Sequence, residues 1–374
     1  MNICFIFADK PHELNTSIYR IILPAYGISK LPEKHKVSMM PIDLFVKGGN
    51  DVDLAVNDAD IIVIERNFFG DVLHKMLSLY MQGKIIVTNF DDAYHAITPT
   101  NPSYTFWNEG KIKITENDRI VEKYIYPHPF EQFKRGISIS HAMTLPSHFL
   151  GDYYQEITGT PSYYVRNYFE TKNYPYIKRP KNKKEFIIGW GGSLSHYESF
   201  VDSSVIPALE RIVKERNNVK VCIVGDKRVY DKLPFEEKMF KNYVKNEEWG
   251  TMLANTFDIG IAPLSGEYDK YRSDIKVVEY LLTGKPFAYS NLPPYKEIKN
   301  KGGLSAGSNM NSWYDTLSEI LDKYDEKVEA ILDTFDRNSV DIYEQSQNIV
   351  NIYKQIILTE GRKGYNSNAD LFID

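Results

Sequence analysis

Short apolar runs alternate with longer stretches that carry apolar residues at helical spacing throughout the first half of the chain. The runs are rich in isoleucine and valine, which is typical of buried strands in a parallel sheet. We predict strands at 3–7, 36–40, 60–64, 84–88, about 142–145 and 163–165. We predict helices between them at 17–29, 70–81 and about 147–157. Strands that alternate with helices in this way form a parallel sheet with helices on its faces.

A stretch rich in proline, lysine and asparagine at 173–185 interrupts this alternation and is predicted to be a linker. The alternation then resumes, with strands predicted at 186–190, 219–224, 257–262 and 286–289, and helices at about 198–216, 247–255, 273–283 and 309–323. The pattern predicts an α/β fold with two Rossmann-like doubly wound domains, 1–172 and 186–340. The last part, 341–374, is a helix and tail that either caps the second domain or crosses back to the first.

Length and composition agree with this organisation. A chain of 374 residues is long enough for two domains. Its hydrophobic fraction of 43% and charged fraction of 25% are those of ordinary globular proteins. The formal net charge of −5 argues against a protein whose main affinity is for nucleic acid. The chain carries no signal-peptide core and no apolar run long enough to span a membrane. We therefore expect a cytoplasmic protein, in the host cytoplasm if the gene belongs to a phage.

Neither the cysteines nor the histidines indicate a metal site. Cys4 and Cys222 both lie in apolar runs and are predicted to be small buried hydrophobes. The histidines show no metal-ligand spacing with cysteine or with acidic residues. We expect neither a metal nor a cofactor.

The strand at 186–190 runs into Gly191-Gly192-Ser193 and then into a helix. A helix N-terminus at the carboxyl edge of a sheet offers free N–H groups and a positive dipole end to phosphates. His196 follows closely enough in sequence to lie beside the same ligand. The alternatives are a tight strand-to-helix turn without a ligand and, for His196, a histidine with no role in binding.

The second candidate site follows the strand at 257–262. Arg272, Lys276 and Glu279 fall at i, i+4 and i+7, which places them on one stripe of the helix predicted at 273–283. Two cations near a helix start suit a diphosphate, and a carboxylate one turn deeper suits the two hydroxyls of a ribose. The alternative is an exposed ladder of ion pairs, which would contribute only about 0.2–0.5 kcal/mol per pair.

Several segments resemble the GT-B glycosyltransferases related to glycogen and sucrose synthases, the family 4-like group. The strongest resemblance is Asp-Ile-Gly-Ile-Ala-Pro-Leu at 258–264, followed by Lys-Tyr-Arg-Ser-Asp-Ile-Lys-Val-Val-Glu-Tyr at 270–280. Further matching segments occur in the right order at 19–25, 60–66, 89–92, 145–147, 165–167, 189–193 and 224–226. The resemblance implies two Rossmann-like domains that face a cleft, and a transferase that binds a nucleotide-sugar.

By this resemblance the second domain binds the donor, for which a UDP-sugar is expected. Glu279 corresponds to the carboxylate that bonds the donor ribose. Arg272 and Lys276 stand where the diphosphate is met and are the expected catalytic cations, because they would stabilise the leaving group. The resemblance also implies a retaining reaction that needs no metal, in which the leaving phosphate helps to take the acceptor's proton. The donor-binding candidates are Gly191, Gly192, Ser193, His196, Lys270, Arg272, Ser273, Lys276 and Glu279.

Two features depart from the family pattern. The usual pair of glutamates eight positions apart is broken, because Tyr271 stands eight positions before Glu279. The common arginine and lysine after the first strand of the second domain are missing from 189–199. We expect the basic residues at 270–276 to compensate for them.

In the first domain, Asp91, Asp92 and His95 follow the strand at 84–88 and would face a ligand from the carboxyl edge of the sheet. Asp92 and His95 are candidate catalytic groups, either as the base of an inverting reaction or as orienting groups in a retaining one. Asp91 is a candidate on the acceptor side. The alternative is that the two aspartates form a turn and a helix cap and that His95 is a surface residue.

Tyr19 and Arg20 are further acceptor-side candidates, and Arg20 either meets a phosphate or pairs with an acid beneath the first helix. The aromatic and proline-containing segment 98–135 has no clear period and is interpreted as an acceptor-side loop region.

These observations predict a hexosyl- or pentosyltransferase that uses a nucleotide-sugar donor and a carbohydrate or other hydroxyl acceptor. One alternative is a glycosyltransferase that acts on modified bases of phage DNA, because the residue bias indicates an AT-rich genome and the basic linker at 178–184 would contact phosphates. Another, of a different class, is a non-catalytic protein that binds nucleotide-sugars.

Overall fold

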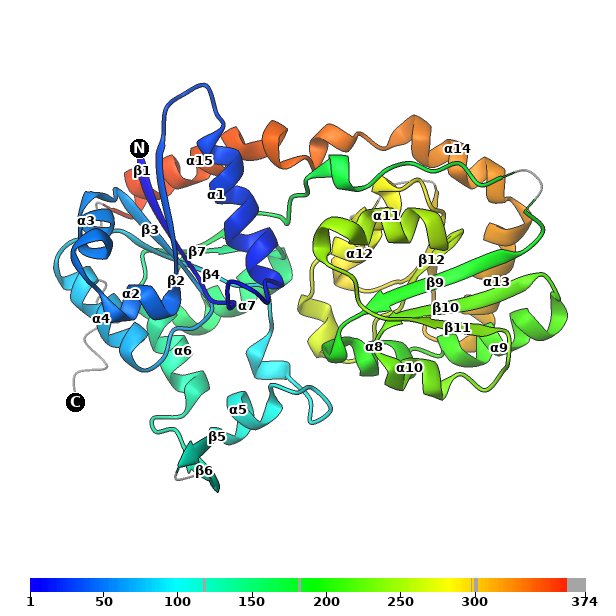
Figure 1. The fold of residues 1–374 in the computed structure, drawn as a ribbon, viewed down its shortest axis with the longest axis horizontal. Coiled ribbons are helices and arrows are strands. Elements are labelled where there is room, and N and C mark those ends of the chain that lie inside the picture. The colour runs from blue at the N-terminus through cyan, green and yellow to red at the C-terminus, as the bar shows by residue number, and fades with distance from the viewer. Residues whose placement is uncertain (117–118, 181–182, 297, 299–301, 362–374) are drawn as a thin grey trace. The chain divides into compact units, whose positions relative to one another are not determined.

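The computed structural model describes residues 1–116, 119–180, 183–296, 298 and 302–361 (Figure 1). The chain divides into two compact units. Unit 1 contains Met1–His95, Thr105–Glu170 and the chain from Asn338 onward. Unit 2 contains Ala96–Tyr104 and Thr171–Arg337. The chain therefore passes between the units at Glu170–Thr171, just before the linker predicted at 173–185.

Unit 1 is built on a six-stranded parallel sheet with the order β2-β1-β3-β4-β7-β8. The strands are β1 Asn2–Phe7, β2 Lys36–Pro41, β3 Ile61–Glu65, β4 Ile86–Asn89, β7 Ala142–Leu145 and β8 Ser162–Tyr164. All six lie at or within two residues of the predicted positions. Their side chains form the core with residues of the first and last helices, such as Ile28 and Ile349.

The helices of unit 1 are α1 Leu23–Ser29, α2 Ile42–Lys47, α3 Asn50–Asp58, α4 Asp71–Met81, α5 Tyr104–Glu109, α6 Pro129–Ser138, α7 His148–Thr158 and α15 Ile342–Thr359. Except for α5, which stands away from the sheet, these helices cover the sheet of unit 1 (Figure 1). The helix predicted at 17–29 begins as a π-helical turn, η1 Ile18–Ile22, before α1. The last helix, α15, lies beside α1 (Figure 1). Gly27 permits this approach, because a Cβ there would stand 2.2 Å from Ser346 Oγ.

The segment 98–135 contains elements that the sequence pattern did not indicate. Besides α5 it forms an antiparallel pair, β5 Lys111–Glu116 and β6 Arg119–Tyr124, which stands away from the sheet of unit 1 (Figure 1). The pair is short and largely exposed, with Ile120 and Tyr124 among its exposed residues. A pattern method finds such strands poorly, because neither face is buried.

Unit 2 is built on a second six-stranded parallel sheet, with the order β11-β10-β9-β12-β13-β14. The strands are β9 Phe186–Gly192, β10 Val219–Gly225, β11 Lys238–Lys241, β12 Ile259–Ala262, β13 Phe287–Ser290 and β14 Gly303–Ala306. The helices are α8 Tyr197–Val201, α9 Val205–Glu215, α10 Lys227–Lys232, α11 Asn246–Thr256, α12 Ile275–Leu282, α13 Met310–Asp322 and α14 Tyr324–Thr334. The predicted class of two doubly wound α/β domains is therefore confirmed.

Unit 2 differs from the prediction in several details. The helix expected at 198–216 is two helices, because Ser204 has a positive φ of 63° and breaks it. Strands β11 and β14 and helices α10 and α14 were not predicted. Short 3₁₀ turns complete the chain at Tyr94–Ala96, Thr171–Asn173, Leu194–His196, Tyr268–Tyr271, Pro293–Tyr295 and Arg337–Ser339.

The segment predicted as a linker packs into unit 2 as far as it is described. Tyr174 is buried, and its carbonyl accepts a hydrogen bond of 3.0 Å from Arg337. Lys183 donates to the buried carboxylate of Asp258 at 2.7 Å. Residues 181 and 182 of the predicted linker lie outside the described residues. Over the part of the chain that the structure describes, no helix is long and apolar enough to cross a membrane.

Candidate functional site

The two segments singled out in the second half of the sequence meet at one edge of unit 2. Strands β9 and β12 are neighbours in the sheet, and both run into turns at their carboxyl ends. The turn after β9 is the 3₁₀ turn Leu194–His196, which will be called the β9 turn. The turn after β12 is Tyr268–Tyr271, followed by the start of α12. Ligands of open α/β sheets bind at such carboxyl edges.

Arg272 joins the two turns. It is extended at φ −65° and ψ 170° and precedes α12, so it does not lie on the helical stripe predicted for it. Its Nη2 donates to the carbonyl of Ser195 at 2.7 Å, and its Nη1 lies 3.1 Å from Nε2 of His196. Its guanidinium also lies 4.6 Å from the ring centre of Tyr268. The cation is thus held in one position over the β9 turn.

His196 is neutral in this arrangement. A guanidinium can only donate hydrogen bonds, so Nε2 of His196 accepts and the ring proton lies on Nδ1. Burial and the positive charges of Arg272 and Lys276 hold the pKa of His196 well below its ordinary value. Nδ1 is buried and has no hydrogen-bond partner among the residues that the structure describes.

Asp269 supports Arg272 and was not predicted from the sequence. Its side chain is buried, with only 1% of the residue exposed. It accepts hydrogen bonds from Arg272 Nε at 2.6 Å, from Ser199 Oγ at 2.9 Å and from the backbone N–H of Ser265 at 2.7 Å. The buried negative charge therefore has donors on both oxygens, and it fixes the orientation of the guanidinium. The only sequence signal for it is the i, i+3 spacing to Arg272.

Lys276 lies in the first turn of α12, with its ammonium 5.6 Å from the ring centre of Trp190. It makes no hydrogen bond and no ion pair with any described residue. Burial lowers its pKa to about 8, with Glu279 acting in the opposite direction and Arg272 adding to the fall. A cation at a helix N-terminus without a counter-ion is a favourable place for an anionic group.

Glu279 lies one turn further along α12. It is 6% exposed, and Tyr174 Oη donates to its Oε1 at 3.4 Å. Because Glu279 is buried and Arg272 precedes the helix, an exposed ladder of ion pairs does not describe these residues. The helix itself is seated closely on the sheet, since a Cβ on Gly260 of β12 would stand 2.6 Å from the ring of Tyr280.

The two glycines of the β9 strand are required by packing. A Cβ on Gly191 would stand 2.2 Å from Cη2 of Trp249, and a Cβ on Gly192 would stand 2.4 Å from Cζ2 of Trp190. Both glycines are buried, and the rings of Trp249 and Trp190 fill the space beside their Cα atoms. Ser193 is the first exposed residue after them, and its hydroxyl lies 3.0 Å from that of Ser195.

The remaining donor-binding candidates lie near Arg272 in sequence. Lys270 is ion-paired with Glu267 at 2.5 Å and is partly exposed. Ser273 is half-buried and directly precedes the N-cap of α12, Asp274. The structure therefore brings together Arg272, Lys276 and His196, while Lys270 is directed to a partner of its own.

In unit 1, Arg20 is 1% exposed and lies beneath the carboxyl ends of several strands. It donates to Asn89 Oδ1 at 2.8 Å, to the carbonyl of Val165 at 2.6 Å, to Asn167 Oδ1 at 3.0 Å and to the carbonyl of Thr144 at 3.1 Å. These acceptors are neutral, so the expectation that Arg20 meets a phosphate or pairs with an acid does not describe its contacts. Its bonds tie the ends of β4 and β7 to the segment after β8.

A network of acidic residues surrounds Arg66, the residue after β3. Arg66 contacts Asp9 and lies 3.4 Å from Glu65, and its φ of 30° is unusual for a residue other than glycine. Glu65 is fully buried and accepts from Ser17 Oγ and from the backbone N–H of Ala8 at 2.8 Å. Burial raises the pKa of Glu65, and the nearby Arg66 opposes that rise. This network was not predicted.

Asp91 lies close to the same network. Burial and the charge of Asp92 raise the pKa of Asp91 to about 7, while Arg20 and Arg66 oppose the rise. Its Oδ1 is buried without a hydrogen-bond partner in the described part of the chain. A carboxyl group with this pKa holds or releases a proton near neutral pH, which is the behaviour of a general base or acid.

The other first-domain candidates have aromatic surroundings. His95 stacks on Tyr153, with ring centres 3.7 Å apart, and its Nδ1 lies 3.4 Å from Tyr154 Oη. Tyr19 packs edge-on against Phe169 at 5.4 Å. Asp92 is half-buried beside Asp91. Within the described ranges, no three histidine, cysteine or acidic side chains are grouped as metal ligands.

No protein-family model matches the chain, and no curated protein matches it. Solved structures do match over nearly the whole chain. Anabaena HepE in complex with UDP and glucose has 12% identity, covers 94% of this chain and 99% of its own, and gives a TM-score of 0.62. A glycosyltransferase from Rickettsia africae has 12% identity, coverage of 96% and 98%, and a TM-score of 0.60.

A protein from Listeria monocytogenes assigned as a UDP-N-acetylglucosamine 2-epimerase is also similar, with 11% identity, coverage of 97% and 99%, and a TM-score of 0.54. Identities this low establish an architecture and leave the chemistry to the residues. The two parallel-sheet domains of this chain match the two-domain GT-B architecture of these structures. The chain therefore has the GT-B fold that the sequence resemblance implies.

Proposed function

We propose that the protein is a glycosyltransferase that moves a sugar from a UDP-sugar to a hydroxyl acceptor, with retention and without a metal. The observation that carries this proposal is Lys276, a half-buried cation that makes no ion pair with any described residue and lies at the N-terminus of α12. A diphosphate would supply the missing negative charge. The complexes of HepE with UDP and with UDP and glucose lend support from a protein of the same fold.

In this proposal Arg272 and Lys276 bind the diphosphate and stabilise the charge that develops on it as the bond to the sugar breaks. Arg272 is already oriented by Asp269 and the carbonyl of Ser195, so little reorganisation is needed when the charge appears. The charge of Lys276 is poorly solvated, because burial lowers its pKa to about 8. Such a charge interacts more strongly with an anion than an exposed lysine does.

Glu279 binds the ribose hydroxyls in this proposal. An ionised carboxylate accepts about four hydrogen bonds. Tyr174 Oη donates to one oxygen of Glu279 through a long contact of 3.4 Å. Because Lys276 and Glu279 are one turn apart on α12, a single helix would hold both the diphosphate and the ribose of one nucleotide.

The stereochemical outcome depends on what takes the acceptor's proton. Retention assigns this role to the leaving phosphate. Asp91, with a pKa of about 7 and an unpartnered buried oxygen, favours inversion as the second candidate, because an inverting reaction requires a protein base. The anomeric configuration of the new glycosidic bond, read by proton NMR and compared with that of the donor, distinguishes the two.

The two other functions predicted as alternatives gain less support. A DNA acceptor would use the basic linker, yet Arg179 lies 3.4 Å and Lys183 lies 2.7 Å from the buried Asp258, so both are engaged within unit 2. Lys181 lies outside the described residues. A non-catalytic binding protein would bind UDP-sugars with the same residues but would neither transfer nor hydrolyse them.

The proposal is tested by titrating the purified chain with UDP and a panel of UDP-sugars in a calorimeter, and then by following UDP release. We expect micromolar to millimolar binding of UDP and its loss by at least tenfold in Arg272→Ala and Lys276→Ala. Lys214→Ala is the matched control, because Lys214 is an exposed lysine on helix α9 of the same unit. Equal UDP affinity in all four proteins would refute the site, and UDP binding with no turnover would favour the non-catalytic alternative.

A further inference from the structure

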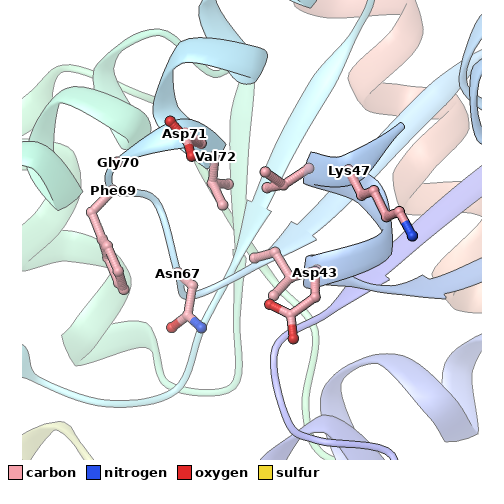
Figure 2. Close-up of a pocket in the computed structure, with 9 residues that line it drawn as sticks. Asp43, Lys47, Asn67, Phe69, Gly70, Asp71 and Val72 are labelled. Carbon is pink, nitrogen blue, oxygen red and sulfur yellow. The ribbon is translucent and has the colours of Figure 1, made fainter. Parts of the chain in front are cut away.

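A pocket of about 390 Å³ lies in unit 1, where β2 and β3 end (Figure 2). One wall is α2, which directly follows β2, and the other is the turn between β3 and α4. This volume is at the lower end of the roughly 300–1,000 Å³ typical of ligand pockets. The pocket therefore fits one small ring better than an extended chain.

The turn that forms one wall is fixed before any ligand binds. The backbone N–H of Gly70 donates to Gln132 Oε1 at 2.8 Å. The ring of Phe69 packs against Phe106 at 5.0 Å and against Trp107 at 6.0 Å. A ligand that enters such a preformed wall orders few protein groups, which limits the entropic cost of binding.

Two polar side chains of the pocket are available to a ligand. Asp43 comes from α2 and Asn67 from the opposite wall, and Figure 2 shows both directed toward the same side of the pocket. Neither makes a hydrogen bond or an ion pair with another residue that the structure describes. An amide both donates and accepts, and a carboxylate accepts, so together they match hydroxyl groups. A wholly apolar ligand would bury them without partners at a cost in free energy.

The charges around the pocket disfavour an anion. Asp43 and Asp71 are both exposed carboxylates of the lining. The one lysine of the lining, Lys47, directs its ammonium away from the other labelled side chains (Figure 2). Lys75 of α4 is not among the lining residues, and its ammonium donates to the carbonyl of Phe45 at 2.5 Å. Like charges at this range repel, and the repulsion is strongest at low salt.

We propose that this pocket binds an uncharged, hydroxyl-bearing sugar ring, with Asn67 bonding its hydroxyls and Asp43 excluding anionic rings of the same shape. The ring packs on Phe69, whose apolar face suits the C–H side of a sugar. The further assignment of this ring as the acceptor of the sugar transfer rests on the proposed function. The preference of the pocket for neutral over anionic rings does not depend on the proposed function.

The test uses the full chain and saturation-transfer NMR at low salt. The probes are the methyl glycosides of glucose, galactose and mannose, and the methyl glycosides of glucuronic and galacturonic acid. A neutral hexoside is expected to bind, and its uronic counterpart at least about fivefold more weakly. Asn67→Ala is expected to weaken the neutral ligand about three- to tenfold, as the loss of one or two hydrogen bonds does.

Asp43→Asn and Asp51→Asn provide a matched pair of variants. Each aspartate is exposed and is the second residue of its helix, α2 or α3, and only Asp43 lines the pocket. Asp43→Asn is expected to bring the uronic and neutral ligands to within about twofold of each other, and Asp51→Asn to leave their ratio unchanged. This ratio is informative even if Asn67→Ala does not fold.

Three results would overturn the proposal. They are a panel in which no neutral glycoside binds, a uronic glycoside that binds as tightly as its neutral counterpart, and an equal effect of Asp43→Asn and Asp51→Asn. UDP binding is measured on the same samples, which separates the two hypotheses. Glycoside binding without UDP binding would refute the proposed function and keep the pocket. UDP-dependent transfer to anionic acceptors alone would refute the pocket and keep the transferase.

Discussion

Lys276→Met is expected to make the protein more stable and to remove tight UDP binding. The side chain of Lys276 is held where its charge is poorly solvated, and its pKa falls from 10.5 to about 8. A change of this size corresponds to about 3 kcal/mol of unfavourable free energy for the charged form in the folded state. Because the residue is only half-buried, solvent screening reduces the figure, and we expect a gain of about 1–3 kcal/mol for methionine at pH 7.

The pH dependence gives this prediction a sign. The folded-state pKa of Lys276 lies below the unfolded value, so the unfolded chain holds the extra proton between about pH 8 and 10.5. The stability of the wild-type protein therefore gains a contribution from this group as the pH rises through that window. Lys276→Met lacks this contribution, so the stabilities of the two proteins are expected to converge toward pH 10.5. Urea unfolding at pH 7 and pH 10 measures the difference.

Binding of UDP adds a second measurement on the same residue. A bound diphosphate favours the charged form of Lys276. At pH 8 the Lys276 side chain is charged in about half of the free protein molecules, because its pKa is about 8. Binding is therefore expected to take up about half a proton per molecule. Calorimetry in buffers of different ionisation enthalpy reads this number directly. The variant is expected to lose tenfold to a hundredfold in UDP affinity, the range for a hydrogen bond between charged groups.

The matched control is Lys214→Met, because Lys214 is an exposed lysine on α9. This substitution is expected to change the free energy of unfolding by no more than about 0.5 kcal/mol and to leave UDP affinity unchanged. The reasoning would be refuted if Lys276→Met were less stable than the wild type at pH 7. It would equally be refuted if UDP binding to the wild type took up no protons at pH 8.

Three further predictions concern the residues around the two sites. Asp269→Asn is expected to weaken UDP binding at least tenfold and to destabilise the protein by about 3 kcal/mol, because Arg272 loses a buried counter-ion; binding and urea unfolding measure both effects. Arg20→Met is expected to cost about 3 kcal/mol or more of stability and to leave UDP affinity unchanged, and a selective loss of affinity would instead give Arg20 a place at the phosphate. Asp91→Asn is expected to abolish any rise in turnover centred near pH 7 if Asp91 is the base, and an unchanged pH profile would return that role to the leaving phosphate.

Much of the fold follows from the sequence, because buried parallel strands leave a strong local signal. The six strands of the unit 1 sheet appear as apolar runs, and the observed bounds differ from the prediction by no more than two residues. Strand β11, Lys238–Lys241, was not predicted because it begins and ends with lysine, lies at the edge of the sheet and is only half-buried. Helix α14 carries apolar residues, yet it follows α13 with almost no interruption. It buries only Tyr324, Lys327 and Ile331, so its apolar face gives a weak signal in the sequence.

The supporting contacts of the site could not be read from the sequence. Tyr174 reaches Glu279 across 105 positions, and Ser199 reaches Asp269 across 70. No local pattern connects residues so far apart. Arg20 presents the opposite difficulty, because a single arginine in an apolar helix gives no sign that its partners are neutral carbonyls and amides. The sequence identifies the charged residues, but only the folded structure shows which residues they contact.

The absence of basic residues that the sequence resemblance leads one to expect has a physical explanation in the position of Arg272. The turn after β9 lacks the arginine and lysine that the resemblance leads one to expect between 189 and 199. Arg272 comes from the neighbouring turn, yet its guanidinium bonds the carbonyl of Ser195 and contacts His196 within the β9 turn. A positive charge is therefore present at the β9 turn, although the residue that supplies it follows Ser195 by 77 positions in the sequence.

This arrangement requires that the β9 turn itself remain free of cations. A lysine or arginine in place of His196 would meet the charge of Arg272 at close range and would be driven from the site or neutralised. The neutral histidine accepts a hydrogen bond from Arg272 instead, so it orients the cation without opposing it. Asp269 then balances the one buried charge that remains. The β9 turn thus lacks the expected basic residues for the same electrostatic reason that it contains His196 and is supported by Asp269. In the proposed function, Lys276 is then the cation that the ligand neutralises.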